Sequence, residues 1–279
     1  MIELITDSTS DISPALAEQL GVRVLPLVVN FGEESFLDGV GISNGEFYER
    51  LRNVETLPTT SQINPEAFAA VFQEVIDRGN QAVGVFVSSE LSGTFQSAMI
   101  AKDMVDGDAI HLVDSRGVAI SLRLLIHEAM DLRERGCSAQ EIQQELERLR
   151  DKIRLFAVVD TLKYLKMGGR ISAATAVVGG VLGISPIVAV EGGKVLSAGK
   201  ARGRKAGAAW VLETARKEEL DFSRPVALGH TDCPEAMETL EAAFGELMDQ
   251  FADVYRTEIG AVVGTHAGPG AAGIAYFVK

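Results

Sequence analysis

The first half of the chain alternates short apolar runs with segments that repeat apolar positions on one helical face. Residues 2–6 and 82–87 are apolar runs of strand length, and residues 65–76 have the spacing of an amphipathic helix. Capping boxes at Ser43–Glu46 and Ser138–Glu141 mark two further helix starts. This alternation predicts right-handed βαβ units on a parallel sheet. The expected strands are 2–6, 22–31, 82–87, 109–113 and 155–159, and the expected helices include 13–20, 65–79, 119–135 and 138–151.

The pattern changes after Asp160, where a basic connector interrupted by glycines covers residues 161–171. We expect the domain boundary there, with residues 1–160 in a first domain and residues 161–279 in a second. The most apolar stretch, 173–190, is interrupted by glycines and a proline. It therefore predicts a helix, a turn and a buried strand rather than a membrane span.

The second half mixes a hairpin with crossover connections. Apolar runs at 184–190 and 194–197 flank Glu191–Gly193, which predicts a β-hairpin. Residues 262–270 are expected to form a tight glycine-rich loop. Together these features predict a mixed sheet that helices cover on one face. The other expected elements are helices at 205–218 and 234–250 and strands at 226–229, 254–259 and 272–278.

Composition excludes several classes of partner and site. The 279 residues include 26 Lys and Arg against 39 Asp and Glu, a net charge of −13, which argues against nucleic acid as the main partner. The two cysteines, Cys137 and Cys233, form no C-x-x-C motif, so we expect no zinc site and no redox pair. The N-terminus lacks the features of a signal peptide. We therefore expect a cytoplasmic protein without an integral membrane segment.

Residues 86–98 are the most informative stretch, because an apolar strand, a hydroxyl-rich turn and a helical pattern follow one another there. Such turns lie at the carboxyl ends of parallel strands, where open α/β sheets place their ligands. Ser92 is the expected N-cap of the helix, and Gly93 lets a ligand approach the backbone. Free N–H groups and the helix dipole favour an anion. The alternative interpretation is an ordinary helix cap.

Three polar segments follow or precede predicted strands: Thr59–Ser61, Ser88–Thr94 and Thr265–His266. If they meet at one sheet edge, their hydroxyls, N–H groups and single histidine form a cradle for an anion such as a carboxylate. This places Thr60, Ser61, Ser92, Gly93 and His266 among the candidate ligand-binding residues.

A serine hydrolase is the main enzymatic alternative, with Ser92 as nucleophile and His266 as base. The nucleophile-elbow pattern G-x-S-x-G is absent around Ser92, which favours binding over hydrolysis. No phosphate-binding loop for ATP and no H-E-x-x-H motif occurs, so we expect no cofactor and no metal. Asp7 and Asp11 are interpreted as part of a polar turn rather than as metal ligands.

The sequence resembles the DegV family over nearly its whole length. Each motif is weak alone, but their order is highly specific. The motifs are Thr6–Asp11, Pro58–Gln62, Ser88–Ala98, Asp160–Leu162, Gly168–Ile171, Gly264–His266 and Gly268–Ala271.

The resemblance implies a bacterial protein that binds one long-chain fatty acid, such as palmitate, in an apolar tunnel. It implies two α/β domains, an α/β/α domain with a parallel sheet and a two-layer domain with a mixed sheet. The family's carboxylate ligands fall on Thr60 and Ser92, and His266 completes the hydrogen-bond network. This sequence departs from many relatives at Ile63–Pro65, where they have a proline directly after the residue equivalent to Gln62.

Some members of the family serve as the binding subunit of an ATP-dependent fatty acid kinase. The resemblance places kinase docking at Arg202, and we add Arg170 from the connector motif as a second docking candidate. Lys200–Lys205 concentrates basic residues in an acidic chain, and we expect it to open a helix. A small-molecule carrier related to dihydroxyacetone-binding proteins is a further alternative.

Overall fold

Two main sheets organise the chain in its computed structural model, which describes residues 1–171 and 183–279. The first sheet has four strands in the order β2-β1-β6-β7, and every neighbouring pair is parallel. Its strands are β1 (Ile2–Asp7), β2 (Val22–Leu25), β6 (Gln81–Phe86) and β7 (Ile110–Asp114).

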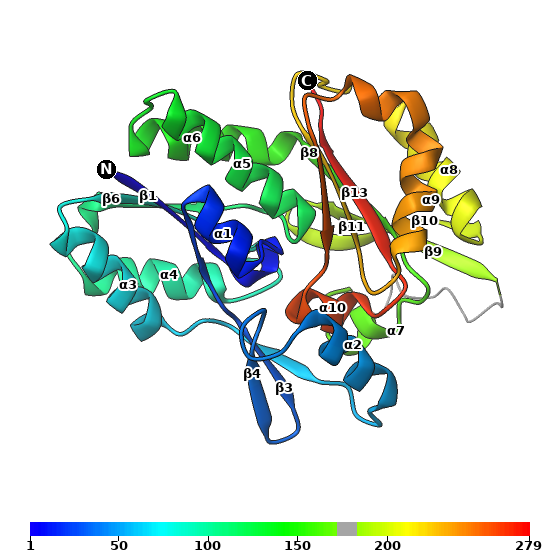
Figure 1. The fold of residues 1–279 in the computed structure, drawn as a ribbon, viewed down its shortest axis with the longest axis horizontal. Helices are drawn as coiled ribbons and strands as arrows, with labels where there is room; N and C mark the ends of the chain where they lie inside the picture. The colour runs from blue at the N-terminus through cyan, green and yellow to red at the C-terminus, as the bar shows by residue number, and fades with distance from the viewer. Residues whose placement is uncertain (172–182) are drawn as a thin grey trace.

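Helices cover both faces of this parallel sheet (Figure 1). On one face, Phe68 and Phe72 of α3 and Ala98 of α4 pack on Ile5 and Ile110. The helices α5 and α6 pack on the other face. Successive residues of β1 pack on opposite faces, with Leu4 in the cluster on one side and Ile5 in the cluster on the other. The caps Asn64 and Ser138 match the sequence pattern. The helices are α1 (Pro14–Leu20), α3 (Pro65–Asp77), α4 (Thr94–Met104), α5 (Ile120–Glu134) and α6 (Ala139–Leu149).

The second sheet has six strands in the order β10-β9-β8-β13-β11-β12. Among the described strands of this sheet, β11 and β12 pair in parallel and the other neighbours pair antiparallel, so the sheet is mixed as expected. The helices α8 (Arg204–Ala215) and α9 (Pro234–Phe244) cover its outer face (Figure 1). Its strands are β8 (Ile153–Val158), β9 (Ile184–Glu191), β10 (Lys194–Arg202), β11 (Val226–His230), β12 (Val254–Glu258) and β13 (Ala272–Phe277).

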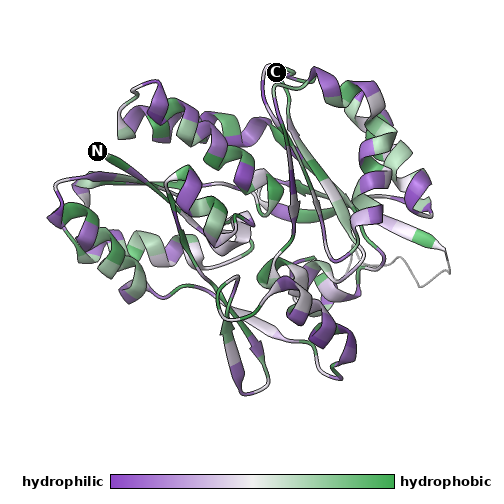
Figure 2. Ribbon diagram, in the orientation of Figure 1, coloured by the Kyte–Doolittle hydropathy of each residue, from purple (hydrophilic) through white to green (hydrophobic). Residues whose placement is uncertain are grey.

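The helix α5 belongs to the cores of both sheets. Its side chains are buried almost without interruption from Ile120 to Ala129, and the same cluster includes Leu4 of β1 and Ala275 of β13. Most other helices alternate hydrophobic and hydrophilic residues, as expected of helices with one buried face (Figure 2). The two sheets are therefore joined through one helix.

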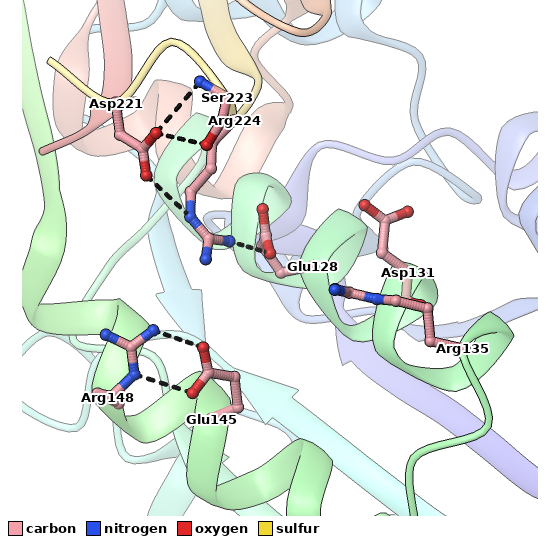
Figure 3. Close-up of polar contacts among 8 residues, drawn as sticks. All are labelled: Glu128, Asp131, Arg135, Glu145, Arg148, Asp221, Ser223 and Arg224. Carbon is pink, nitrogen blue, oxygen red and sulfur yellow. Dashed lines mark hydrogen bonds and ion pairs between the residues drawn. The ribbon is translucent and has the colours of Figure 1, made fainter. Parts of the chain in front are cut away.

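An ion pair reinforces this junction (Figure 3). Glu128 of α5 accepts a hydrogen bond from Arg224, which precedes β11 and also pairs with Asp221 at 3.3 Å. The Glu128 side chain is only 5% exposed, and burial raises the pKa of its carboxyl group. Arg148 and Glu145 form a comparable but exposed pair within α6.

A smaller unit completes the fold below the two sheets in Figure 1. It contains a three-stranded sheet in the order β4-β3-β5, and its short helices pack beside that sheet. The elements are β3 (Val28–Phe31), β4 (Glu34–Leu37), β5 (Thr59–Ser61), α2 (Asn44–Asn53), α7 (Lys163–Met167) and α10 (Ala261–Ala267). The short 3-10 helices are η1 (Ser8–Ser10), η2 (Gly107–Ala109), η3 (Arg150–Lys152) and η4 (Gly245–Gln250).

Several expectations about the elements are wrong. The single strand expected at 22–31 is divided at Pro26, which has no N–H for a ladder, and its halves join different sheets. The strand β8 was expected in the parallel sheet but pairs antiparallel with β9 and β13. The chain therefore enters the second sheet at β8, before residue 161. The domain boundary at 160/161 stays a prediction.

Two further differences concern helices. Most of the glycine-rich loop expected at 262–270 is the helix α10 (Ala261–Ala267) instead, because buried carboxyl groups accept hydrogen bonds from the backbone N–H groups at its start. On α4 the buried face is formed by Ser97, Ala98 and Ala101, so Met99 and Met104 lie on the exposed side. The helix expected after residue 173 lies outside the described residues. None of the helices in the described ranges is long and apolar enough to span a membrane.

Candidate ligand-binding site

A cavity of about 210 Å³ lies where the inner face of the second sheet meets α5 and α10. Its walls are mostly apolar, since strands of the mixed sheet contribute alternating inward-facing residues. A small number of polar groups lies among its lining residues. The apolar lining includes Ile120, Leu155, Val159, Val188, Val190 and Val262.

Thr60 and His266 form the hydrogen-bonded pair in this wall. Thr60 Oγ1 lies 3.0 Å from His266 Nε2, and both residues line the cavity. Thr60 is the middle residue of β5, and His266 lies in the last turn of α10. The structure thus brings together two of the predicted polar segments.

The imidazole of His266 is closely surrounded by neighbouring residues. A Cβ atom on Gly168 would lie 2.2 Å from its Nδ1, so a side chain at position 168 would displace the imidazole. Nδ1 itself is buried and has no hydrogen-bond partner in the part of the chain that the structure describes. Burial, with a smaller contribution from the charge of Arg170, lowers the pKa of His266 to about 4. The imidazole is therefore neutral at neutral pH.

Ser92 and Gly93 line the same cavity. The expected N-cap is one residue too early, because Gly93 is the N-cap of α4 and provides no side chain. Ser92 Oγ instead accepts a hydrogen bond from the N–H of Thr94 at 3.3 Å and shares another with Thr94 Oγ1 at 2.9 Å. The hydroxyl of Ser92 therefore lies at the start of the helix, as the anion hypothesis requires.

Gln62, the last residue of the Pro58–Gln62 motif, is a lining residue that was not among the predicted site residues. A Cβ atom on Gly93 would lie 2.0 Å from Gln62 Oε1, and Gln62 Nε2 donates to Ser97 Oγ at 2.8 Å. Gly93 thus makes room for Gln62. His230 and Thr231, at the end of β11, also line the cavity and were missed, because the strand pattern alone gives no sign of what faces it.

Ser61 and Arg170 have different surroundings from those expected. Ser61 lines the cavity, but its hydroxyl accepts a hydrogen bond from Asn30 at 3.1 Å. Arg170 also lines the cavity, and its guanidinium donates to the carbonyl oxygens of Leu91 at 3.1 Å and Gly168 at 2.7 Å. Arg170 therefore connects the backbone next to Ser92 with the backbone that lies beside the imidazole of His266. Its docking role stays a prediction.

Arg202 is exposed at the end of β10 and was wrongly expected at the start of a helix. The helix α8 begins at Arg204, which forms an ion pair with Asp160 at 3.1 Å. The dipole argument from the sequence therefore applies to Arg204 and Lys205 rather than to Arg202. Lys200 and Arg202 lie two residues apart on one face of β10.

The arrangement does not provide an activated serine. Among the described residues, the hydrogen bonds of Ser92 involve Thr94, and the Nε2 atom of His266 faces Thr60. A serine hydrolase needs the nucleophile and the base within hydrogen-bond reach of each other. This geometry favours binding of a polar head group over nucleophilic catalysis.

A sequence model described as "Uncharacterised protein, DegV family" matches residues 1–279. The chain belongs to the DegV family. It is 36% identical over 279 residues to a DegV domain-containing protein of Caldanaerobacter subterraneus subsp. tengcongensis, covering 100% of this chain and 99% of that protein.

Solved DegV structures share the fold of this chain. One is described as fatty acid binding of a DegV family protein from Thermus thermophilus, with a TM-score of 0.88, 32% identity, and coverage of 100% of this chain and 99% of that one. Another is a stearic acid-binding protein from Eubacterium ventriosum, with a TM-score of 0.88, 29% identity and the same coverage. The two-domain α/β fold implied by the resemblance is therefore confirmed.

Proposed function

We propose that this DegV protein binds one long-chain fatty acid, with the acyl chain in the apolar cavity and the carboxylate at Thr60 and Ser92. The observation that carries the proposal is the apolar cavity whose wall includes the Thr60–His266 pair. Burying each methylene group contributes about 0.8 kcal/mol, so a long acyl chain supplies most of the affinity. The fatty acids bound by its relatives from Thermus thermophilus and Eubacterium ventriosum support the same ligand class.

The neutral imidazole of His266 can orient the hydroxyl hydrogen of Thr60. With its proton on Nε2, His266 donates to Thr60 Oγ1, which leaves the Thr60 hydroxyl hydrogen free to donate to a carboxylate. Ser92 supplies a second hydroxyl beside the N-terminus of α4, where negative charge is favourable. Burying a carboxylate without such donors would be costly. The site therefore selects an acid over an alcohol or an ester.

We further propose that the protein acts in the cytoplasm as a binding subunit and presents the carboxylate to an ATP-dependent fatty acid kinase. The absence of an ATP-binding motif from the sequence supports a separate catalytic partner. The exposed Lys200 and Arg202 side chains on β10 are positively charged and would attract an acidic surface of the partner. Charges at the edge of an interface mainly set the rate of association.

Mass spectrometry tests the ligand assignment directly. The protein is purified without added lipid, and lipids extracted from it are compared with those from a Thr60→Val/Ser92→Ala variant. We expect a fatty acid in the wild type and a large loss in the variant. Wild-type protein that carries no fatty acid and takes up none of an added palmitate and oleate mixture would refute the assignment.

A further inference from the structure

Two buried carboxyl groups hold the start of the helix that carries His266. Asp11 Oδ1 accepts a hydrogen bond from the Gly260 N–H at 2.7 Å, and Asp38 Oδ1 accepts one from the Ala261 N–H at 2.9 Å. Asp11 follows η1, and Asp38 follows β4, so both come from the N-terminal part of the chain. An ordinary helix start needs only one side-chain cap.

The same end of α10 is fixed by a third contact. The hydroxyl of Tyr48 donates to the carbonyl oxygen of Ile259 at 2.8 Å, and a Cβ atom on Gly264 would lie 2.6 Å from that hydroxyl. The helix has only seven residues, so its far end follows any movement of its first turn. At that far end, His266 lies 3.0 Å from Thr60 Oγ1.

This arrangement is costly to the folded state. Asp11 has a φ angle of 53°, in the left-handed region that non-glycine residues rarely adopt. The Oδ2 atoms of Asp11 and Asp38 are buried and have no hydrogen-bond partner among residues 1–171 and 183–279. Unpaired buried polar atoms and such backbone conformations destabilise a protein and concentrate at functional sites.

We propose that Asp11 and Asp38 are positioning residues for His266: by fixing the first turn of α10, they set the imidazole against Thr60. The inference rests on the proposed function in one respect, that the Thr60–His266 pair receives the ligand's head group. In this role, Asp11 and Asp38 act only through the helix, without contact to the ligand or to Thr60.

The charges around the pair fit this role. A Cβ atom on Gly260 would lie 3.1 Å from Asp38 Oδ1 and 3.2 Å from Asp11 Oδ1, so the two carboxyl groups are close neighbours. Burial raises the pKa of both, and their mutual repulsion raises that of Asp11 further. The other groups that face them are Asp7 of β1, Arg123 of α5 and Tyr48 of α2.

Two such carboxyl groups retain a proton between them more readily than separate ones. An asparagine at either position has the shape of a protonated aspartic acid and keeps the carbonyl acceptor for the helix N–H. Single Asn variants should therefore preserve the positioning, whereas Ala variants remove the acceptor and release the helix.

The experiment compares Asp11→Ala, Asp38→Ala, Asp11→Asn and Asp38→Asn, with Asn64→Ala as the matched control. Asn64 caps α3 by accepting a hydrogen bond from Ala67 N–H at 2.8 Å, so its loss destabilises a helix start that is not attached to His266. The first readout is the imidazole titration of His266 by NMR in the ligand-free protein, assigned with a His266→Asn variant. The second is the affinity for palmitate and for hexadecanol.

We expect the Ala variants to move the pKa of His266 from about 4 toward its ordinary value of 6.5, because the released imidazole meets water. Palmitate affinity should fall about tenfold, and hexadecanol affinity should change less, since a charged head group depends more on an oriented donor. The Asn variants should match wild type in both readouts. Asn64→Ala should lower thermal stability without moving the His266 titration.

Folded Ala variants with a wild-type His266 titration would overturn the positioning role, as would an equal shift in Asn64→Ala. If the Ala variants do not fold, Asp11→Glu and Asp38→Glu replace them, since a longer side chain displaces the helix start without removing the acceptor. An unchanged His266 titration in folded Glu variants would overturn it as well. If wild type binds no palmitate, the proposed function fails, while the titration in ligand-free protein still tests the positioning.

Discussion

The hydroxyl of Thr60 lies 3.0 Å from Nε2 of His266, although 206 positions separate the two residues in the chain. One residue is on a short strand of the smallest sheet, and the other is on a helix between strands β12 and β13 of the second sheet. The contact exists because α10 packs against α2 and the small sheet in one apolar cluster. The head-group site is therefore assembled from both ends of the chain.

This pair predicts a difference between an acid and an alcohol. Thr60→Val and Ser92→Ala each remove one hydroxyl donor, and a hydrogen bond to a charged group contributes about 1.5–3 kcal/mol. Each variant should weaken palmitate binding by about ten- to a hundredfold and hexadecanol binding by much less. Calorimetric titration of delipidated protein measures both. Equal losses for both ligands would indicate general damage to the cavity instead.

The buried imidazoles predict how stability depends on pH. Burial lowers the pKa of His266 and of His127 to about 4, whereas the value in the unfolded chain is about 6.5. The unfolded state therefore binds protons first as the pH falls, and these two groups lose their stabilising contribution between pH 6.5 and 4. Above pH 6.5 they contribute no pH dependence.

His266→Asn should remove the part of the stability loss between pH 6.5 and 4 that comes from His266. His127→Asn should remove the part that comes from His127. Asp7, whose pKa burial raises from 3.8 to about 6, acts in the opposite sense, because it destabilises the folded state as the pH rises through that window. The measurement is therefore the difference in unfolding free energy between variant and wild type at several pH values. A pH-independent difference for His266→Asn would contradict a neutral buried imidazole.

The ion pair between α5 and the second sheet predicts a large loss of stability. Arg224→Ala leaves the carboxylate of Glu128 buried and unpaired, which typically costs about 3–5 kcal/mol. The matched control is Arg148→Ala, which breaks the exposed pair with Glu145 and should cost less than about 1 kcal/mol. Urea denaturation measures both. Similar losses for the two variants would show that the junction does not depend on this pair.

Much of the fold follows from patterns within single elements. The capping boxes at Ser43 and Ser138 and the hairpin at Glu191–Gly193 are local signals, and the structure confirms them. The polar segments that contain Thr60, Ser92 and His266 also follow from their composition and their places beside strands. All three residues line one cavity, and their role in ligand binding stays a prediction.

The errors arise where a distant contact decides the local structure. The start of α10 depends on the carboxylates of Asp11 and Asp38, so no pattern near residue 262 indicates a helix. The sequence of β8 has the apolar pattern of a buried strand, which does not show the direction of its neighbours. Its antiparallel partners β9 and β13 come later in the chain. The apolar part of the cavity lining was not predicted either, because it combines inward-facing residues of the second sheet with residues of distant helices and loops.

If a kinase docks at Arg202, changing this residue should affect phosphorylation of the bound fatty acid and not its binding. Arg202 is exposed on β10 and lies outside the cavity lining, so Arg202→Ala should leave folding and palmitate affinity unchanged while it lowers phosphorylation of bound fatty acid. Arg202→Lys should recover only part of the rate, because lysine lacks the planar two-point contact of arginine. The control is Arg216→Ala, which removes an exposed arginine after the other end of α8. Unchanged turnover at every protein concentration would exclude docking at Arg202.

We propose that the cavity beside Thr60 and His266 holds one long-chain fatty acid. Native mass spectrometry of delipidated protein, titrated with palmitate, tests it most directly. We expect a single palmitate per chain in the wild type and a strongly reduced complex in Thr60→Val/Ser92→Ala. A wild-type protein that stays free of ligand, or a double variant that binds palmitate as well as the wild type, would contradict it.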